Sequence, residues 1–553
     1  MIPRVKEYKE LGGCFSCREV TFPKTEDGVA AARLLSLFLP SLSVVTGAAP
    51  TALLAKDPLP DGAYRLAVAR DGIRITYGSY EGLRNAVATL AGLYTDAGFI
   101  CAEIADAPAF GFRSAMLDLA RGYVELPVLY EHLVRMAFLK YNVVHLHLMD
   151  SETYVMESAV VPNPDGHRQY TQAEMRRICE LCRLLCLDVI PEIEFPTHAT
   201  NTLLAVPALW CDIIDPAKAE AAVSVPQLDK RLLARDRRAS AWAVCLGSER
   251  TYEVYRRILA EIADVFPGQY VHVGGDEIAY PHLGAVPNWD NCRACRARME
   301  AEGLADTLAL YHYGFRRLHA ILSELGKRMI KWNEQDELGM PLPLPKDVII
   351  EYWKPKDPGA VEAAPEKLEA EKQLLRDEGF SLINAHYYYT YADFASYMTA
   401  EKMNAWSPAA EGESMMGGET CAWELGNPRY SFYPYRLPIS MALFADRLWN
   451  RDAVPYDSAY RAELFAAAVG RRGLGEAPMG PFPAVLPPTL FGSTTGVPPT
   501  LEAVPAAVDS LRGVDGEGVF GRLFLDAYRA YLETLMTGEA AAADGTLPRD
   551  GAI

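Results

Sequence analysis

The stretch GQYVHVGGDE, Gly268–Glu277, joins a short apolar run to two glycines and two adjacent acids. An apolar run of this length that stops at glycines indicates a buried β-strand. Neighbouring residues of a regular strand point to opposite faces, so Asp276 and Glu277 can share one space only if the strand has already ended. Gly274 and Gly275 allow the chain to bend at that point. The stretch therefore predicts a buried strand that delivers two carboxylates to one site.

Seven further apolar runs of similar length lie between Phe112 and Trp423. They read FRSAMLDLA, NVVHLHLMD, LDVIPEIEF, RMIKWNE, VIIEYW, FSLINAHYY and MMGGETCAW. Helical stretches separate them, among them Pro127–Lys140 and Thr171–Cys186, and the second opens with the capping-box pattern Thr171-x-x-Glu174. Buried strands that alternate with helices form a parallel sheet. Eight such units over about 300 residues predict a (β/α)8 TIM barrel.

The chain on either side of this barrel has a different pattern. Residues 1–108 predict a small N-terminal α/β domain, in which Asp71-Gly72 marks a hairpin and Ser79–Tyr94 an amphipathic helix. The catalytic barrel is expected to take residues 109–450. Residues 451–553 predict a Pro/Gly-rich linker followed by a C-terminal helical extension.

A long insertion, Thr200 to Leu246, separates the third and fourth units of the barrel. It carries two tryptophans, Trp210 and Trp242. These tryptophans could cap a cleft, or they could form the packed core of the insertion itself, and we favour packing.

The 553 residues carry a formal charge of −18, and half of them are hydrophobic. This acidic balance argues against nucleic acid and anionic membranes as partners. The start, MIPRVKEYKELGG, lacks the apolar segment of a secretory signal, and no window reaches the roughly 20 apolar residues that span a bilayer. We therefore expect a soluble, cytoplasmic protein.

The 11 cysteines include three CxxC pairs, Cys14/Cys17, Cys179/Cys182 and Cys292/Cys295. A zinc site usually combines two such pairs, or one pair with histidines, at suitable spacing, and these pairs lie far apart. Cys179, Cys182 and Cys186 fit one face of a helix, which favours packing. Cys292/Cys295 has His282 nearby and stays open to a metal or a disulfide. Free thiols fit a reducing compartment, and we expect no cofactor and no catalytic metal.

Polar and aromatic residues gather where the predicted strands end. In a barrel of this kind the carboxyl ends of the strands carry the function. The candidate site residues, in chain order, are Arg113, His145, His147, Asp150, Glu192, Glu194, His198, Asp276, Glu277, Trp332, Trp353, Tyr387, Tyr388, Tyr389, Tyr391, Trp423 and Glu424. Each alone fits a solvated loop or a packed core, but their recurrence at consecutive strand ends favours one site. Aromatic walls around polar groups suit a sugar ring.

The adjacency of Asp276 and Glu277 limits their chemistry. Glycosidases commonly use two carboxyl groups about 5 to 9 Å apart, on opposite sides of the bond that they break. Two adjacent residues are poorly placed for that arrangement. In a simpler division of roles, Glu277 acts on the leaving oxygen, and Asp276 interacts with a group that the substrate already carries.

The segment HVGGDE, His272–Glu277, resembles the catalytic signature of family 20 glycoside hydrolases, the β-N-acetylhexosaminidases. The likeness extends to FRSAMLDLAR, NVVHLHLMD, VIPEIEFPTHA, CLGSERTYEVYRRILAEIADVFPG and ALFADRLW, and to the small α/β domain before the barrel. It covers the chain from about Gly62 to Trp449. Family 20 is a substrate-assisted exception to the two-carboxylate rule.

This resemblance implies a retaining exo-β-N-acetylhexosaminidase that hydrolyses terminal β-linked GlcNAc or GalNAc. It implies that Glu277 is the general acid and base, and that the substrate's own 2-acetamido oxygen is the nucleophile, giving an oxazolinium intermediate. Asp276 would hold the amide N–H and stabilise the developing charge. The implied substrate-binding residues are Arg113 for sugar hydroxyls, His198 to orient the acid, Trp332, Trp353 and Trp423 around the acetamido methyl, Tyr389 or Tyr388 on its oxygen, and Asp150 and Glu424.

Several positions depart from the family pattern. Glu194 stands where the family usually has Asp, Thr197 where it has Gly, and MDSETY replaces the usual Asp-Asp-Gln segment. After Trp423 the acid follows directly as Glu424, where the family has Trp-x-Glu. The last difference concerns recognition of O4 and O6, and with it the choice between gluco- and galacto-configured sugars.

Two other functions remain open on these residues. His145, His147, His198 and Asp276 could hold zinc in a metal-dependent barrel hydrolase, although this leaves the tryptophans and Glu277 without a role. The shifted acid after the last tryptophan fits a non-catalytic sugar-binding relative, against which the intact acid pair argues. Metal analysis and the behaviour of a Glu277→Gln variant separate both from the glycosidase.

Overall fold

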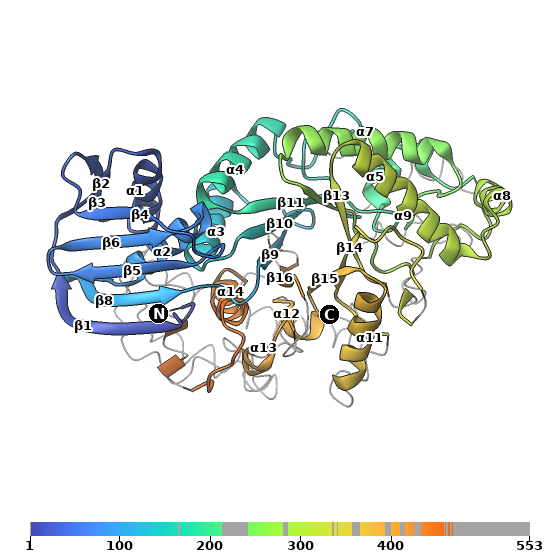
Figure 1. Ribbon diagram of the computed structural model, residues 1–553. Helices are drawn as coiled ribbons and strands as arrows, with labels where there is room; N and C mark the ends of the chain where they lie inside the picture. The colour runs from blue at the N-terminus through green and yellow to red at the C-terminus, as the bar shows by residue number, and fades with distance from the viewer. Residues whose placement is uncertain are drawn as a thin grey trace, which may run out of the picture.

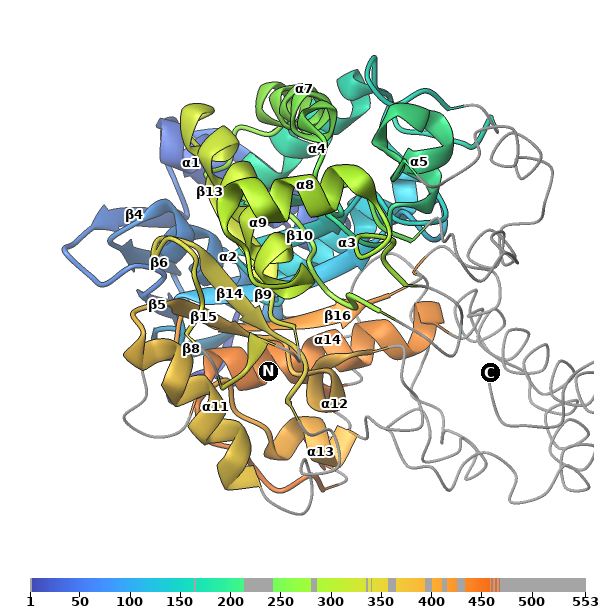
Figure 2. The same ribbon diagram turned by 90° about the vertical axis from the view of Figure 1, so that its right-hand side faces the viewer.

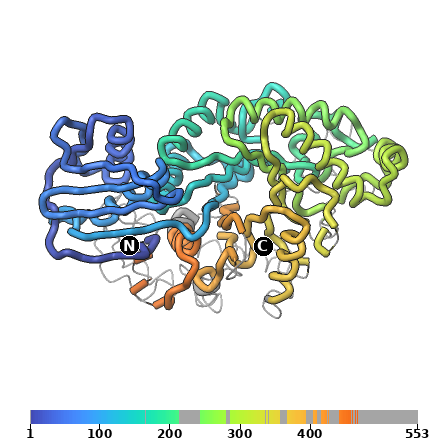
Figure 3. The backbone as a smooth tube through the Cα atoms, viewed as in Figure 1, coloured from blue at the N-terminus to red at the C-terminus, as the bar shows by residue number. Residues whose placement is uncertain are grey.

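The computed structural model describes residues 2–163, 166–212, 242–279, 286–334, 337–339, 341–356, 365–392, 400–409, 415–423, 425, 433–457, 459–460, 463–464 and 467. An N-terminal α/β domain lies beside a closed barrel of eight parallel strands, so the predicted fold class is confirmed (Figure 1). The two parts are equally distinct in the trace of the backbone (Figure 3). Glu424, His282 and the predicted helical extension after residue 467 lie outside the described residues.

A six-stranded sheet forms one face of the N-terminal domain. Its order is β1 (Glu7–Phe15), β8 (Gly98–Asp106), β5 (Tyr64–Ala69), β6 (Gly72–Tyr77) and β4 (Ala52–Lys56), with β7 (Tyr94–Thr95) on β8. A separate parallel pair joins β2 (Glu19–Pro23) to β3 (Ser43–Gly47). Ala69 pairs with Gly72 in an antiparallel ladder, which confirms the predicted hairpin.

Two capped helices lie on the side of the N-terminal domain that faces the barrel, one packed on β5 and β6 and the other on β2 and β3. They are α1 (Glu26–Phe38) and α2 (Tyr80–Gly92). The side chains of Thr25 and Ser79 accept hydrogen bonds from backbone N–H groups of the first turns, as expected of N-cap residues. Both helices contact the barrel helix α3 (Leu126–Phe138), so they lie between the strands of this domain and the barrel.

All eight predicted apolar runs form barrel strands. These are β9 (Phe112–Asp118), β10 (Val143–His147), β11 (Asp188–Glu192), β12 (Tyr270–His272), β13 (Arg328–Trp332), β14 (Ile349–Tyr352), β15 (Ser381–Asn384) and β16 (Gly417–Ala422). Each pairs in parallel with its neighbours, and β16 closes on β9. Every residue of β9 and β10 is buried, as expected where helices cover one face of a sheet and core fills the other.

Helices surround these strands. Besides α3 they are α4 (Gln172–Leu185), α5 (Thr200–Ala205), the 3-10 turn η1 (Pro207–Leu209), α7 (Glu249–Val265), α8 (Arg293–Glu302), α9 (Thr307–Glu324), α11 (Pro365–Asp377), α12 (Tyr387–Thr390), α13 (Ala400–Ala405) and α14 (Tyr433–Trp449). The predicted capping box of Thr171 and Glu174 is present at the start of α4. Figure 2 shows α14 running alongside β16, which it contacts. Among the described helices, none is long and apolar enough to cross a membrane.

A buried charge joins the N-terminal domain to the barrel. The ammonium of Lys140, before β10, lies 2.9 Å from Oδ2 of Asp106 and 2.9 Å from the hydroxyl of Tyr64. The other oxygen of Asp106 accepts a hydrogen bond at 2.9 Å from the indole of Trp449, at the end of α14. Removing one partner of such a buried pair costs about 3–5 kcal/mol. The N-terminal domain, the barrel and its last helix therefore share one electrostatic anchor.

Candidate active site

The turn after β12 brings the two adjacent acids to the carboxyl end of the barrel. β12 ends at His272, and Gly274 and Gly275 follow with φ angles of +63° and +103°, a region that favours glycine. A Cβ atom on Gly274 would lie 1.9 Å from Oε2 of Glu194, so a side chain has no room there. Glu277 adopts a φ of +55°, which is uncommon for a residue with a side chain. The predicted bend at the two glycines is therefore confirmed.

Both carboxylates of the acid pair reach the same imidazole. Oε2 of Glu277 lies 3.0 Å from Nε2 of His198, and Oδ2 of Asp276 lies 3.5 Å from that nitrogen. The hydroxyl of Thr197 donates to the Asp276 carbonyl at 2.7 Å and fixes the backbone between them. The two acids thus face one space, side by side rather than across from each other.

His198 ends a chain of buried charges. Its Nδ1 lies 3.3 Å from Oδ1 of Asp150, whose Oδ2 lies 2.6 Å from the guanidinium of Arg121. Burial alone would lower the pKa of His198, but the carboxylates of Asp150 and Asp276 raise it well above its ordinary value. Burial would raise the pKa of Asp150, but Arg121 and His198 hold it well below its ordinary value. The imidazole is therefore a cation that can donate a hydrogen bond to Glu277.

Asp276 offers an acceptor that the described residues leave unsatisfied. Its Oδ1 is buried, and no described group donates a hydrogen bond to it. Burial is the main cause that raises the pKa of Asp276 to about 6, against the opposing effect of the His198 cation. A buried acceptor without a donor costs free energy. This oxygen is therefore suited to an N–H group that a ligand brings.

An aromatic cluster stands at the same end of the barrel. Its tryptophans, Trp332, Trp353 and Trp423, come from the ends of β13, β14 and β16. The rings of Trp332 and Trp423 lie 6.0 Å apart, and the indole of Trp332 donates to Glu192 at 2.7 Å. The guanidinium of Arg121 lies 5.0 Å from the ring of Trp423, close enough for a cation–π contact. The structure thus brings the three predicted tryptophans together, next to the charged chain.

Tyr387 and Tyr391 pack with these tryptophans, whereas Tyr389 packs elsewhere. Tyr391 is parallel to the ring of Trp353 at a centroid distance of 6.2 Å, and Tyr387 lies 6.3 Å from the same ring. Tyr389 joins the main hydrophobic core and lies 5.4 Å from the ring of His386. This differs from the expectation for Tyr389, because the chain forms the short helix α12 here. Residues four apart share a side of a helix.

Arg113 lies at the opposite end of the barrel from the acids. It is the second residue of β9, and its side chain is 2% exposed. Its guanidinium donates to the carbonyl groups of Lys140 at 2.9 Å and Phe110 at 2.7 Å, and it pairs with Glu81 of α2. These partners lie at the amino end of the strand, where the N-terminal domain packs. The prediction that Arg113 binds a substrate at this site is therefore wrong.

Arg121 is the site arginine that sequence reasoning missed. It follows the carboxyl end of β9 by three residues and pairs with Asp118 at 3.0 Å and with Asp150 at 2.6 Å. The signal was present in FRSAMLDLAR, since Arg121 closes the same segment that Arg113 opens. The two arginines differ in which end of β9 they occupy: Arg113 lies at the amino end, and Arg121 lies beyond the carboxyl end.

The histidines of β10 are committed to carboxylates. Nδ1 and Nε2 of His145 lie 2.9 Å from Glu419 and 3.1 Å from Glu192. Both nitrogens of His147 also contact carboxylates, at 2.8 and 3.2 Å. Burial lowers the pKa of His145, but Glu419 and Glu192 raise it to about 9, and that of His147 is also well above its ordinary value. Both nitrogens of each of these two rings therefore face carboxylate oxygens.

Trp242 supports the acid-bearing turn from the insertion. Its indole donates to the carbonyl of Glu277 at 3.0 Å, and its ring lies 4.4 Å from that of His198. Trp210 donates instead to the carbonyl of Leu203 at 2.6 Å. Trp242 is buried, so it packs as we expected, but it packs against the acids.

The assembled site has three chemical capacities. Glu277 can exchange a proton, and its Oε2 lies 3.0 Å from the imidazole of His198. The neighbouring Asp276 can accept a hydrogen bond in a buried place, where such a bond is strong. The aromatic rings can hold the apolar face of a ligand.

Two family models match the chain. The model of the glycosyl hydrolase family 20 catalytic domain matches residues 110–424, and that of glycosyl hydrolase family 20 domain 2 matches residues 1–107. The curated β-hexosaminidase of Porphyromonas gingivalis is 28% identical over 335 residues, which are 55% of this chain and 39% of that protein. The chain thus spans well under two thirds of the length of that relative.

Solved structures of similar fold include two bacterial enzymes. The β-N-acetylhexosaminidase of Bacteroides fragilis has a TM-score of 0.70 at 23% identity, over 84% of this chain and 94% of that one. The family 20 exo-β-N-acetylglucosaminidase of Vibrio harveyi, solved with N-acetylglucosamine, has a TM-score of 0.67 at 23% identity, over 84% and 76%. At this identity the likeness establishes the fold.

Proposed function

Because the chain belongs to glycosyl hydrolase family 20, we propose that it is a retaining exo-β-N-acetylhexosaminidase that removes terminal β-linked GlcNAc or GalNAc from glycans. The observation that carries this proposal is the convergence of Asp276 and Glu277 on one nitrogen of His198, at 3.5 and 3.0 Å. The tryptophans beside them suit the apolar faces of a sugar. The N-acetylglucosamine bound by the Vibrio harveyi relative supports the same class of substrate.

The convergence argues against two carboxylates that act from opposite sides of the bond. Two-carboxylate glycosidases hold these groups about 5 to 9.5 Å apart, with the sugar between them. Here both groups come from adjacent residues of one turn and contact the same imidazole nitrogen, so they approach a ligand from the same side. The nucleophile then has to come from the substrate, and a 2-acetamido group holds its carbonyl oxygen within reach of the anomeric carbon.

In the first step, Glu277 protonates the glycosidic oxygen while the acetamido oxygen attacks the anomeric carbon. The bond from that carbon to the leaving oxygen breaks, the leaving alcohol keeps the proton, and a cyclic oxazolinium ion forms. Asp276 accepts the amide N–H at its unsatisfied Oδ1 and stabilises the positive charge of the new ring. His198 donates a hydrogen bond to the carboxylate that Glu277 has become.

In the second step, the Glu277 carboxylate takes a proton from water as the water oxygen attacks the anomeric carbon. The bond from that carbon to the acetamido oxygen breaks, which restores the acetamido group and the protonated acid. The anomeric centre is inverted twice, so the sugar leaves with its original β configuration.

We assign the acetamido group to the aromatic cluster. Trp332, Trp353 and Trp423 would enclose its methyl group, which lies on the apolar side of the amide. A hydroxyl of Tyr387 or Tyr391 would donate to its carbonyl oxygen, since these are the tyrosines that pack with the tryptophans.

The test of this function compares two aryl β-glycosides that differ only at C2. The N-acetylglucosaminide should be hydrolysed at least about 100-fold faster than the plain glucoside, because only the first carries the nucleophile. Replacing the methyl hydrogens of the acetamido group one by one with fluorine should lower kcat/KM stepwise, since fluorine withdraws electrons from the attacking carbonyl oxygen. Equal turnover of the two glycosides would refute the substrate-assisted reaction, and a matching GalNAc glycoside measures the preference at C4.

The two arginines of the first barrel segment should have separable effects. Arg113→Met should lower the free energy of unfolding by about 3–5 kcal/mol, because it breaks the ion pair with Glu81 and removes the donors to the carbonyls of Lys140 and Phe110. The kcat/KM of the folded protein should be nearly unchanged. Arg121→Lys keeps the charge but loses the fork that spans Asp118 and Asp150. We propose that Arg121 holds sugar hydroxyls, so this variant should lose about 10- to 100-fold in kcat/KM. Denaturant unfolding and steady-state kinetics of both variants give the answer, and the reverse pattern would contradict it.

A further inference from the structure

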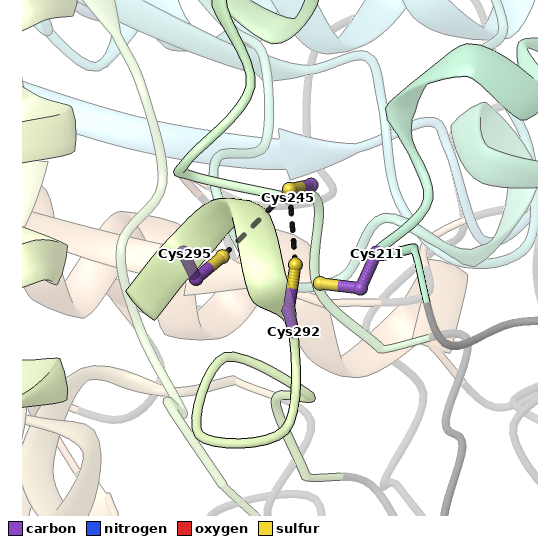
Figure 4. A group of neighbouring side chains, drawn as sticks. All are labelled: Cys211, Cys245, Cys292 and Cys295. Carbon is purple, nitrogen blue, oxygen red and sulfur yellow. Dashed lines mark hydrogen bonds between the residues drawn. The ribbon is translucent and has the colours of Figure 1, made fainter. Parts of the chain in front are cut away.

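Four cysteines from three separate segments meet outside the barrel interior. Cys211 follows η1, Cys245 precedes α7, and Cys292 and Cys295 open α8. All four side chains are buried, and their sulfur atoms point toward one another (Figure 4). Any two of the four sulfur atoms lie within 4.8 Å. One CxxC pair thus acquires two further thiols that are distant in the sequence.

The sulfur spacing matches a tetrahedral metal site rather than a disulfide. Sγ of Cys245 lies 3.6 Å from Sγ of Cys292 and 3.7 Å from Sγ of Cys295. A disulfide bond measures about 2.05 Å. Four thiolates at about 2.3 Å from a central zinc ion stand about 3.8 Å from one another. The observed Sγ–Sγ distances are therefore those expected between two thiolates that bind the same zinc ion.

The segments that carry these cysteines are packed too tightly for a large rearrangement. A Cβ atom on Gly247 would lie 2.2 Å from the backbone of Ala294, which stands between Cys292 and Cys295. The indole of Trp289 donates to the carbonyl of Val244 at 2.9 Å. Backbone contacts thus hold the thiols in place from both sides.

We propose that Cys211, Cys245, Cys292 and Cys295 bind one zinc ion in a closed, tetrahedral, structural site. Four thiolates fill the coordination shell, so no position remains for water or substrate, and the ion takes no part in the sugar chemistry. Tetrahedral sulfur sites select zinc or iron, and zinc is the redox-inactive choice for a purely structural role.

The ion would fix the two ends of the insertion to α8. Cys211 and Cys245 flank residues 212–244 of the sequence, and only two residues separate Cys245 from Trp242. Trp242 in turn holds the Glu277 carbonyl at 3.0 Å. Zinc at this site would therefore position Trp242, which holds the backbone of Glu277, although the ion itself lies outside the site that binds substrate.

The first experiment measures metal in the full chain, purified natively without metal-affinity resin or chelators. Elemental analysis should give about one zinc per chain, and zinc-edge X-ray absorption should give four sulfur ligands at about 2.3 Å. A protein that is free of metal, one that holds iron instead, or a mass lower by the hydrogens of disulfides would overturn the proposal. None of these readouts depends on glycosidase activity.

Paired variants then assign the ligands. Cys292→Ser/Cys295→Ser should lose the zinc, whereas Cys14→Ser/Cys17→Ser, a matched CxxC pair in the N-terminal domain, should keep it. If the first variant does not fold, titration of the wild type with an organomercurial reagent should release the zinc as the four cluster thiols react, which peptide mapping identifies. Retention of zinc by the Cys292/Cys295 variant, or release that follows other thiols, would refute the assignment.

Discussion

Glu277→Gln is expected to lower kcat/KM for an aryl β-N-acetylglucosaminide by about 10²- to 10⁴-fold, the contribution of a positioned general acid. Glutamine has the same shape and can still accept the hydrogen bond from His198, now 3.0 Å away, so the fold should be retained. The loss should grow as the leaving group becomes more basic, because a good leaving group departs without a proton. A series of aryl glycosides with graded leaving-group pKa measures this dependence.

The control for Glu277→Gln is its stability and its affinity for the product sugar. Both should stay close to those of the wild type, since neither depends on proton transfer. A variant that keeps full activity would exclude Glu277 as the acid. A wild type that binds the sugar but does not turn over any of the glycosides would favour the non-catalytic relative instead.

Asp276→Asn should lower kcat by about 10²- to 10³-fold and raise KM by far less. The carboxylate stabilises a charge that develops only on the way to the oxazolinium ion, so its loss falls on the transition state rather than on binding. A rise in KM of the same size, with an unchanged kcat, would show that Asp276 only binds the ground state.

The pH dependence of the same variant distinguishes this role from damage to the fold. Burial raises the pKa of Asp276 to about 6, so wild-type kcat/KM should fall below that pH as the carboxylate is protonated, and this limb should disappear in Asp276→Asn. The ionised group also destabilises the folded protein. That cost is absent below the unfolded pKa near 3.9 and grows until the pH passes 6. Asp276→Asn should therefore be no less stable than the wild type at pH 7, and a thermal melt checks it.

The strands and the acid turn could be predicted because local pattern determines them. Eight apolar runs have the length and burial of parallel strands, and a capping box marks the start of α4. The residue type of Gly274 and Gly275 was enough to predict the bend. The side-by-side placement of Asp276 and Glu277 followed from their adjacency. The two central residues of the site could therefore be predicted from one segment of the sequence.

The errors arose where the sequence does not give direction or local geometry. Arg113 and Arg121 belong to the same segment, but β9 spans about 20 Å, which separates its two ends completely. Tyr389 or Tyr388 was expected from the family resemblance alone, whereas the helical turn α12 places Tyr387 and Tyr391 beside the tryptophans. The thiol cluster was hidden for a third reason. Cys211 and Cys245 are single residues with no spacing that points to Cys292.

The anchor at Lys140 has a consequence for how this protein can be divided. Asp106 belongs to the small domain, Lys140 to the barrel, and Trp449 to the last helix, yet they satisfy one buried charge. A barrel severed from residues 1–107 would lose Asp106, the ion-pair partner of Lys140, and Glu81, the ion-pair partner of Arg113. The two modules recognised by sequence are thus one cooperative unit, and recombination in evolution or in the laboratory has to move them together.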